Sequence, residues 1–228
     1  MKRETLTTLL ADRDTRRPAA LLRWLATDQA LLVHQPDETS DPALAAATKT
    51  ALASDRAQTV TTEHGDVFVQ PFNPPLRMII VGAVHIAQHL APMATSLGYS
   101  VTVVDPRSAF ATPERFPAVQ LSREWPDQAL TQIEVDARTA VITLSHDPKF
   151  DDPALVAALD SKAFYIGALG SRANHARRLE RLRAHGCGEA DLRRIHGPVG
   201  LAIGARAPSE IAVSIVAEVT RALREPGA

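Results

Sequence analysis

The 228-residue chain has a single cysteine, few aromatic residues and no excess of charge of either sign. One cysteine cannot form an internal disulfide or supply a site of several thiolates, and such sparse use is typical of a reducing compartment. Lysine and arginine number 25 against 26 acidic residues, so the net charge of −1 gives no bulk attraction to nucleic acid or to an anionic membrane. We therefore predict a cytoplasmic protein with no nucleic-acid or membrane partner, in which any anion is bound locally.

Long hydrophobic runs are missing as well. No segment approaches the roughly 18 consecutive apolar residues of a membrane-spanning helix, and the charged start, MKRETLTTLLADRDTRR, lacks the apolar stretch of a signal peptide. Apolar residues nevertheless make up 45% of the chain and charged residues 22%, as in ordinary globular proteins. The composition therefore predicts a folded core, in one large domain or in one domain with a small appendage.

Prolines cluster at residues 71–76 (PFNPPL), where three of six positions hold a residue that neither continues a helix nor donates to a β-ladder. We place a domain boundary there, with a small α+β region at 1–75 and a larger region at 76–228. In the first region a proline opens each of two expected helices. The expected elements are helices at 18–26 and 42–53, a strand at 30–34, and a hairpin of strands 59–62 and 67–72.

Short apolar runs alternate with amphipathic stretches after residue 76, which predicts a parallel sheet covered by helices. The run RMIIV at 77–81 is apolar without alternation, as expected for a strand buried on both sides. The predicted fold class is α/β, with a Rossmann-like, mostly parallel sheet and helices on both faces. The expected strands are 77–81, 100–105, 140–144 and 163–166, and the expected helices are 84–97, 152–159, 173–185 and 208–223.

Candidate binding residues follow these four strands, at the edge where open α/β sheets bind their ligands. We assign neither a catalytic residue nor a metal ligand. The candidate cofactor-binding residues are Gly82, Ala83, Val84 and His85 after the first strand, Asp105 and Arg107 after the second, His146 and Asp147 after the third, and Gly167, Gly170, Ser171 and Arg172 after the fourth.

The first loop has the position of a dinucleotide-binding turn, with Asp105 at the end of the next strand. Of the G-x-G-x-x-G pattern only Gly82 is kept; Ala87 is an accepted replacement for the third glycine. Val84, however, places a β-branched side chain where a pyrophosphate should approach. Two interpretations stay open: NAD(P) binding, weakened by Val84, and a turn that serves packing only.

The next two loops also leave alternatives open. Asp105 and Arg107 either grip a ribose hydroxyl and a phosphate or form a salt bridge with each other. Ser145, His146 and Asp147 are adjacent and cannot converge as a catalytic triad must. His146 is therefore either a proton carrier or ligand donor, or a residue that ties the loop down.

The fourth loop, GALGSR at 167–172, is the better anion site. Its glycines permit an open backbone, Ser171 can cap the following helix, and Arg172 adds charge, so we favour anion contact over capping alone. His85 and His89 are spaced like a pair of metal ligands, but no acid or cysteine completes a site and we expect surface histidines. Cys187 has no neighbouring histidine, and we expect it to be a bystander.

Taken together, these loops resemble the xanthine dehydrogenase accessory protein family, often called XdhC/CoxI. The resemblance runs from about residue 77 to residue 219, in the family's order, and covers the Rossmann-like region nearly completely. The matching stretches are MIIVGAVHIAQHLAPMATSLGYSVTVVDPRSAFATPERFP, LSHDPKFDDPALVAAL, FYIGALGSR and GPVGLAIGARAPSEIAVSIVAEV.

The resemblance implies an accessory or chaperone protein for molybdenum hydroxylases of the xanthine dehydrogenase or CO dehydrogenase type. Such a protein binds the pterin molybdenum cofactor (molybdopterin), protects its sulfurated form and helps deliver it to an apo molybdenum hydroxylase, its client. It is a binding protein more than a turnover enzyme. Apart from the resemblance, a homodimer formed through the amino-terminal region is a second candidate partner. The phosphate of the pterin suits a crevice with Arg107, Arg172 and a glycine-rich backbone.

The chain also departs from the family. Members commonly carry an amino-terminal domain with a Gly/Pro-rich segment and a Gly-Gly-Cys motif, and this sequence shows neither; only GDVFVQPFNPP resembles its end. Sulfur handling through that cysteine is then not expected here. Two other functions stay open: an NAD(P)-dependent oxidoreductase that uses the Rossmann-like domain, and an interaction protein for which that domain is a scaffold.

Overall fold

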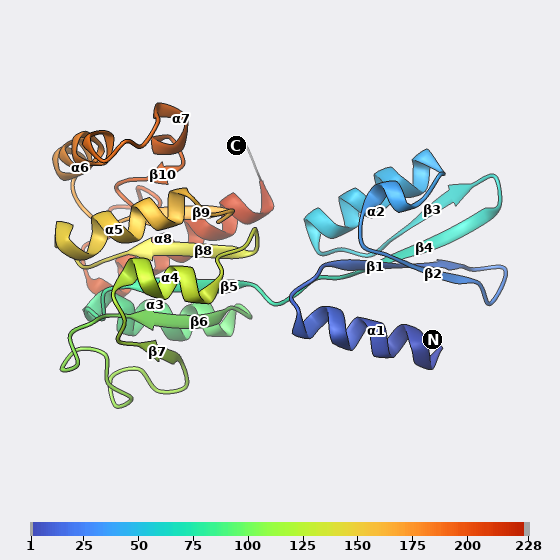
Figure 1. The fold of residues 1–228 in the computed structure, drawn as a ribbon, viewed down its shortest axis with the longest axis horizontal. Helices are drawn as coiled ribbons and strands as arrows, with labels where there is room; N and C mark the ends of the chain where they lie inside the picture. Colours follow the sequence, from blue (N-terminus) through green and yellow to red (C-terminus); the bar gives the residue numbers. More distant parts are fainter. Residues whose placement is uncertain (1, 226–228) are drawn as a thin grey trace. The chain divides into compact units, whose positions relative to one another are not determined.

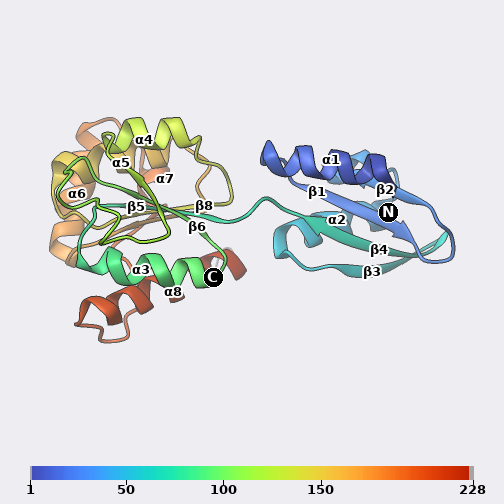
Figure 2. The same ribbon diagram turned by 90° about the horizontal axis from the view of Figure 1, so that it is seen from below.

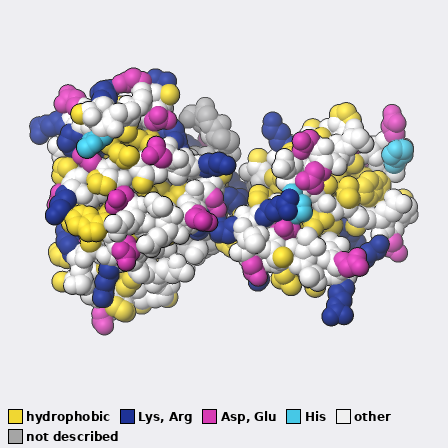
Figure 3. All heavy atoms as spheres, in the orientation of Figure 1, with side chains coloured by type: hydrophobic (Ala, Val, Ile, Leu, Met, Phe, Trp, Pro, Cys, Tyr) yellow, Lys and Arg dark blue, Asp and Glu magenta, His cyan; other side chains and the backbone are white. Residues whose placement is uncertain are grey.

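The computed structural model describes residues 2–225 (Figure 1). It divides into two compact units, one ending at Pro75 and the other beginning at Leu76. In the view of Figure 3, basic and acidic side chains are interspersed over both units, so on this face the nearly balanced charge is not separated into basic and acidic areas. None of the helices in the described part of the chain has the length and hydropathy needed to cross a membrane.

The amino-terminal unit is an antiparallel four-stranded sheet with helices, in the order β2-β1-β4-β3. The predicted helix at 42–53 is confirmed as α2, whose first turn is capped by the Asp41 carboxylate, and the predicted hairpin is confirmed as β3 and β4. The turn between those strands uses Gly65 at φ +97°. The elements are α1 (Arg3–Asp14), β1 (Ala19–Trp24), β2 (Ala30–Val33), η1 (Pro36–Glu38), α2 (Pro42–Ser54), β3 (Gln58–Thr62) and β4 (Gly65–Phe72).

The predicted helix at 18–26 is wrong, because this segment forms the inner strand β1. Ala20 and Leu22 pack with α2 in one apolar cluster, whereas Ala19 and Leu21 are buried on the opposite face of the strand. Figures 1 and 2 show α1 and α2 on opposite sides of this sheet. A strand covered on both faces is continuously apolar, and in a short segment that pattern cannot be distinguished from a buried helix.

The carboxyl-terminal unit confirms the predicted Rossmann-like α/β fold. Its six strands are all parallel and run in the order β10-β9-β8-β5-β6-β7. The strand order reverses between the neighbours β5 and β8, which is where such sheets bind ligands. The strands are β5 (Arg77–Val81), β6 (Ser100–Val104), β7 (Gln120–Ser122), β8 (Thr139–Thr143), β9 (Tyr165–Ala168) and β10 (Ile195–His196); the helices are α3 (His85–Ser96), α4 (Pro126–Ile133), α5 (Pro148–Leu159), α6 (Arg172–Ala184), α7 (Glu189–Leu192) and α8 (Pro208–Arg224).

Helices cover both faces of this sheet (Figure 2): α3 and α8 lie on one side, and α4 and α5 on the other. Side chains along β5 point alternately to the two faces of the sheet. Met78 and Ile80 therefore belong to one apolar cluster, and Ile79 and Val81 to the other. This two-sided burial explains why β5 is apolar without a period of two.

Glu218 of α8 joins the sheet to the loop after β10. This side chain is 7% exposed, and its Oε2 accepts hydrogen bonds from the Tyr165 hydroxyl (2.5 Å) and the Gly200 amide (2.7 Å). Its Oε1 lies 3.5 Å from His196 Nδ1. Burial alone would raise the pKa of Glu218, but hydrogen bonds from His196, Tyr165 and Gly200 outweigh it and lower the pKa to about 2. The ionised carboxylate therefore fastens the loop to the sheet.

Candidate functional site

The loops after β5 and β8 touch each other at the point where the strand order reverses. Gly82 has φ +104°, and a Cβ at this position would lie 2.9 Å from the amide nitrogen of Ser145. A side chain here would be strained by the backbone conformation and would push the two loops apart. Gly82 thus makes the turn that the sequence assigns to it and also permits this close approach.

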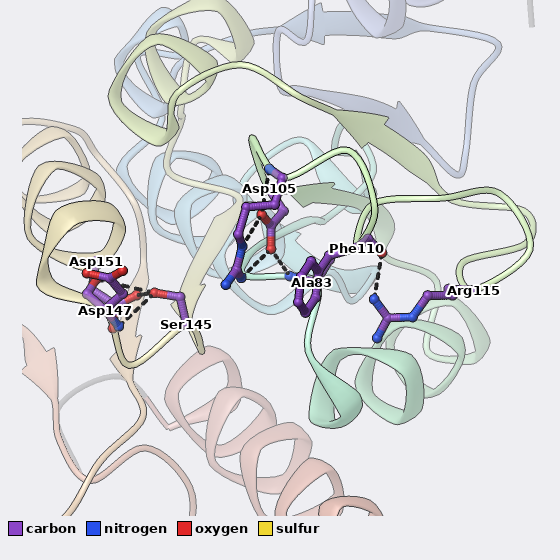
Figure 4. Close-up of polar contacts among 8 residues, drawn as sticks. Ala83, Asp105, Phe110, Arg115, Ser145, Asp147 and Asp151 are labelled. Carbon is purple, nitrogen blue, oxygen red and sulfur yellow. Dashed lines mark hydrogen bonds and ion pairs between the residues drawn. The ribbon is translucent and has the colours of Figure 1, made fainter.

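Asp105 lies at the centre of the first candidate cluster and is 1% exposed. Its two oxygens accept hydrogen bonds from the amides of Ala83 (2.8 Å) and Arg107 (3.0 Å), and from Arg107 Nε (2.9 Å) and Nη2 (2.7 Å) (Figure 4). Burial raises the pKa of this carboxyl, but these hydrogen bonds more than offset it and leave the pKa below its ordinary value. Of the two alternatives left open for Asp105 and Arg107, the structure contains the mutual salt bridge.

Aromatic rings surround the Arg107 guanidinium, although the chain is only 4% aromatic. Its Cζ lies 4.3 Å from the ring centre of Phe110 and 5.2 Å from that of Phe150. The ring of Trp125 packs at a tilt against that of Phe150, and Lys149 Nζ lies 5.1 Å from the centre of the Trp125 ring. Phe110 and Trp125 are 40% and 39% exposed. This cluster is not evident from the sequence, because its members come from three separate segments that only the fold brings together.

The third candidate loop is held by Ser145 and not by its histidine. Ser145 Oγ donates to Asp151 Oδ1 (2.6 Å) and accepts from the Asp147 amide (3.2 Å), while Asp147 caps α5 (Figure 4). His146 is exposed and has φ +62°, in the left-handed region that few residues other than glycine adopt. The Ser145 hydroxyl is thus engaged by Asp151 of α5, outside the three adjacent residues.

The fourth candidate loop connects β9 to α6. Gly170 adopts φ +148°, and Ser171 Oγ accepts a hydrogen bond from the Asn174 amide (3.2 Å), so Ser171 does cap the helix. Gly167 is enclosed by Val199 and Tyr165. Arg172 is exposed, and its side chain has no hydrogen bond or ion pair with any other described residue. The Ser171 cap uses the Asn174 amide, and the amides of Arg172 and Ala173 keep no hydrogen-bond partner among the described residues.

A buried ion pair that the sequence analysis did not identify lies beneath this loop. Arg178 of α6 is 4% exposed and Asp151 of α5 is 1% exposed. Arg178 Nη2 donates to the Leu169 carbonyl (2.7 Å) and lies 3.6 Å from Asp151 Oδ2. Burial raises the pKa of Asp151 and lowers that of Arg178. The available signal was the spacing of four between Arg178 and the buried Leu182, which places both on the inward face of α6.

The remaining candidates lie apart from these contacts. His85 and His89 are both exposed on α3. Burial, followed by the nearby Asp160 and Asp191, raises the pKa of the Cys187 thiol, which therefore lacks the properties of a reactive thiolate. Within residues 2–225 no group of three or more histidine, cysteine or acidic side chains is arranged to hold a metal ion.

Comparison with known proteins gives three findings. The family model described as the XdhC Rossmann domain matches residues 78–219. The chain is 35% identical over 173 residues to a probable xanthine dehydrogenase component from Bacillus subtilis (strain 168), covering 72% of this chain and 50% of that protein. It is 36% identical over 162 residues to the molybdenum cofactor insertion chaperone PaoD of Escherichia coli (strain K12), covering 71% of this chain and 45% of that protein. The chain thus spans about half the length of these curated relatives.

The likeness extends to a solved structure. A crystal structure described as a xanthine dehydrogenase from Bacillus halodurans superposes with a TM-score of 0.71 at 23% sequence identity, covering 98% of this chain and 65% of that chain. At this identity the superposition shows the fold alone.

Proposed function

Because this chain belongs to the XdhC family, whose Rossmann-domain model matches residues 78–219, we propose that it is an accessory protein of molybdenum hydroxylases. In this role it binds the pterin molybdenum cofactor and assists its insertion into an apo-enzyme. The single observation that carries the proposal is the family match across nearly the whole parallel-sheet unit. A relative bearing the name molybdenum cofactor insertion chaperone supports it.

The polar groups at the carboxyl edge of the sheet fit the phosphate of such a cofactor. The amino end of α6 offers free amides and a favourable dipole, and Arg172 is a cation without a competing partner among the described residues. Beneath them, the Nε and Nη1 atoms of the buried Arg178 have no hydrogen-bond partner within the described chain. We assign the phosphate to Gly170, Ser171 and Arg172 on this basis.

The other candidate residues would hold the remainder of the cofactor. Gly82, Ala83, Val84 and His85 line the first loop, and Asp105 with Arg107 fixes the second. His146 and Asp147 belong to the third loop. Gly167 lies within β9, paired with Ile142 of β8. The cofactor would supply its redox chemistry in the client enzyme. In this chain the residues named above would bind and orient the cofactor, and we assign none of them a catalytic step.

The alternative of an NAD(P)-dependent oxidoreductase gains no support from the first two loops. A ribose would need an acceptor on Asp105, but both oxygens of this carboxylate are occupied by Ala83 and Arg107. Val84 directly precedes α3, and its half-buried side chain packs against the apolar core. A dinucleotide-binding loop has a glycine at this position, which allows the pyrophosphate to approach.

The test is to purify the full chain from cells that make the cofactor and to measure pterin fluorescence after oxidative release. We expect bound pterin, and we expect hydroxylase activation to fall when the gene is deleted. Absence of pterin together with unchanged hydroxylase activation would contradict the proposal. Titration with NAD(H) and NADP(H) checks the alternative, for which micromolar affinity would be required. Size-exclusion chromatography with and without an apo molybdenum hydroxylase tests both proposed partners, the client and a second copy of this chain.

A further inference from the structure

Arg178 is a buried cation whose hydrogen-bonding capacity is mostly unused. Its side chain makes one hydrogen bond, from Nη2 to the Leu169 carbonyl, and its Nε and Nη1 atoms find no partner among the described residues. A guanidinium removed from water is costly unless its donors are paired. A fold that keeps such a residue 4% exposed has a strong electrostatic reason to accept an additional anion nearby.

Asp151 only partly compensates this charge. Its Oδ1 is engaged by the Ser145 hydroxyl at 2.6 Å, while its Oδ2 has no hydrogen-bond partner within the described chain and lies 3.6 Å from Arg178 Nη2. This separation is longer than a charge-assisted hydrogen bond, which is about 2.7–2.9 Å. The two charges therefore attract each other, but the hydrogen-bonding groups of neither side chain are satisfied by the pair.

One unused donor of Arg178, Nη1, faces the turn that precedes α6. A Cβ placed on Gly170 would lie 3.7 Å from Arg178 Nη2 and 3.8 Å from Nη1, so the guanidinium is directly against the backbone of this turn. Gly170 is half-buried, and the following residues, Ser171 and Arg172, are exposed. The buried cation thus lies against the turn that leads to the exposed amino end of this 13-residue helix.

We propose that Arg178 is the main cation of an oxyanion subsite at the amino end of α6, which takes a phosphate or a phosphate ester. The arriving anion competes with Asp151 for the guanidinium and accepts hydrogen bonds that Arg178 leaves unused, first of all from Nη1. Arg172 adds long-range attraction from the surface. The inference rests on the proposed function in that the phosphate of the pterin is the expected physiological ligand, but the subsite itself can be tested without the cofactor.

The experiment measures the affinity of the full chain for inorganic phosphate by isothermal titration calorimetry and by thermal shift. Arg178→Gln removes the cation, and we expect it to weaken phosphate binding by about 10- to 100-fold, the scale of hydrogen bonds to a charged group. Arg177→Ala is the matched control, because Arg177 is an exposed arginine on the same helix; its affinity should stay within about twofold of the unmodified chain.

Two further variants separate binding from folding. Asp151→Asn removes the competing carboxylate, so it should bind phosphate more tightly than the unmodified chain, by about threefold or more. The double variant Asp151→Asn/Arg178→Gln removes both charges of the buried pair. Its circular dichroism spectrum should equal that of the unmodified chain, whereas its affinity for phosphate should be as low as that of Arg178→Gln. An Arg178→Gln or double variant that binds phosphate as well as the unmodified chain would overturn the inference, as would an Asp151→Asn variant that loses binding.

The outcome for the subsite and the outcome for the proposed function can be told apart. If the unmodified chain shows no response to phosphate, the subsite is refuted, whereas the accessory role is still decided by pterin content and hydroxylase activation. If the Arg178 variants lose phosphate as expected but the purified chain never carries pterin, the subsite stands and the proposed ligand is wrong.

Discussion

Replacing Glu218 by glutamine tests how strongly the ionised carboxylate stabilises the carboxyl-terminal unit. The pKa of Glu218 falls from the ordinary value of 4.5 to about 2, and each pH unit of lowering is worth about 1.4 kcal/mol. The carboxylate therefore contributes roughly 3 kcal/mol to folding near neutral pH. Glutamine keeps one acceptor oxygen for Tyr165 or Gly200 but loses the charge, so we expect Glu218→Gln to lower the free energy of unfolding by about 2 kcal/mol at pH 7.

The sign of the pH dependence follows from the lowered pKa. Above pH 4.5 the carboxyl is ionised in the folded and the unfolded chain, and the stabilisation is complete. As the pH falls from 4.5 toward 2, the unfolded chain takes up a proton first, and the stabilisation is lost. The difference between the unmodified chain and Glu218→Gln should therefore shrink over this window.

Urea unfolding followed by circular dichroism, at pH 7 and at several values between pH 4.5 and 2.5, measures both effects. Glu124→Gln is the control, because Glu124 is an exposed acid in the same unit, and it should change the unfolding free energy by less than about 0.5 kcal/mol. The stabilising role of the Glu218 carboxylate would be refuted by either of two results. One is that Glu218→Gln is as stable as the unmodified chain at pH 7, and the other is that both chains lose stability in parallel as the pH falls.

Three other variants or measurements probe the edge of the sheet. Gly82→Ala should lower the free energy of unfolding by about 1–3 kcal/mol, because alanine is strained at φ +104° and its Cβ would press on Ser145; an unchanged melting temperature would contradict the close approach. Arg107→Ala should cost about 2–3 kcal/mol in chemical denaturation, since the buried Asp105 keeps only backbone donors; equal stability would show that the pair is dispensable. Cys187 should react with iodoacetamide at pH 8 more slowly than a free thiol, because its pKa is raised, and a rate equal to that of glutathione would refute this.

The sequence predicted the parallel sheet well because its strands are buried on both faces and bounded by glycine or polar residues, as β5 is by Gly82. The same property misled the prediction at residues 18–26, where AALL fits a buried strand and a buried helix equally. The strands β7 and β10 were missed because they are three and two residues long, too short to show a period.

The candidate site was predictable only in outline. Loop position followed from the order of strands, but the sequence could not choose between the salt bridge of Asp105 with Arg107 and a ligand contact, because side-chain direction decides that choice. The buried arginine of ANHARRLERLRA was indicated only by its spacing of four from Leu182. Arg178 differs from Arg177 only in the face of α6 on which it lies, and that face is fixed by packing against α5.

The salt bridge of Arg107 also has a consequence for exchanging the loops at this edge of the sheet. Through Asp105 this arginine is tied to Ala83 after β5, and through Phe150 it reaches the helix that follows β8. Three segments distant in the chain are thus coupled at one guanidinium. Grafting a single loop from a relative would break that coupling, so we expect a stable exchange of these loops to require all three segments to be transplanted together.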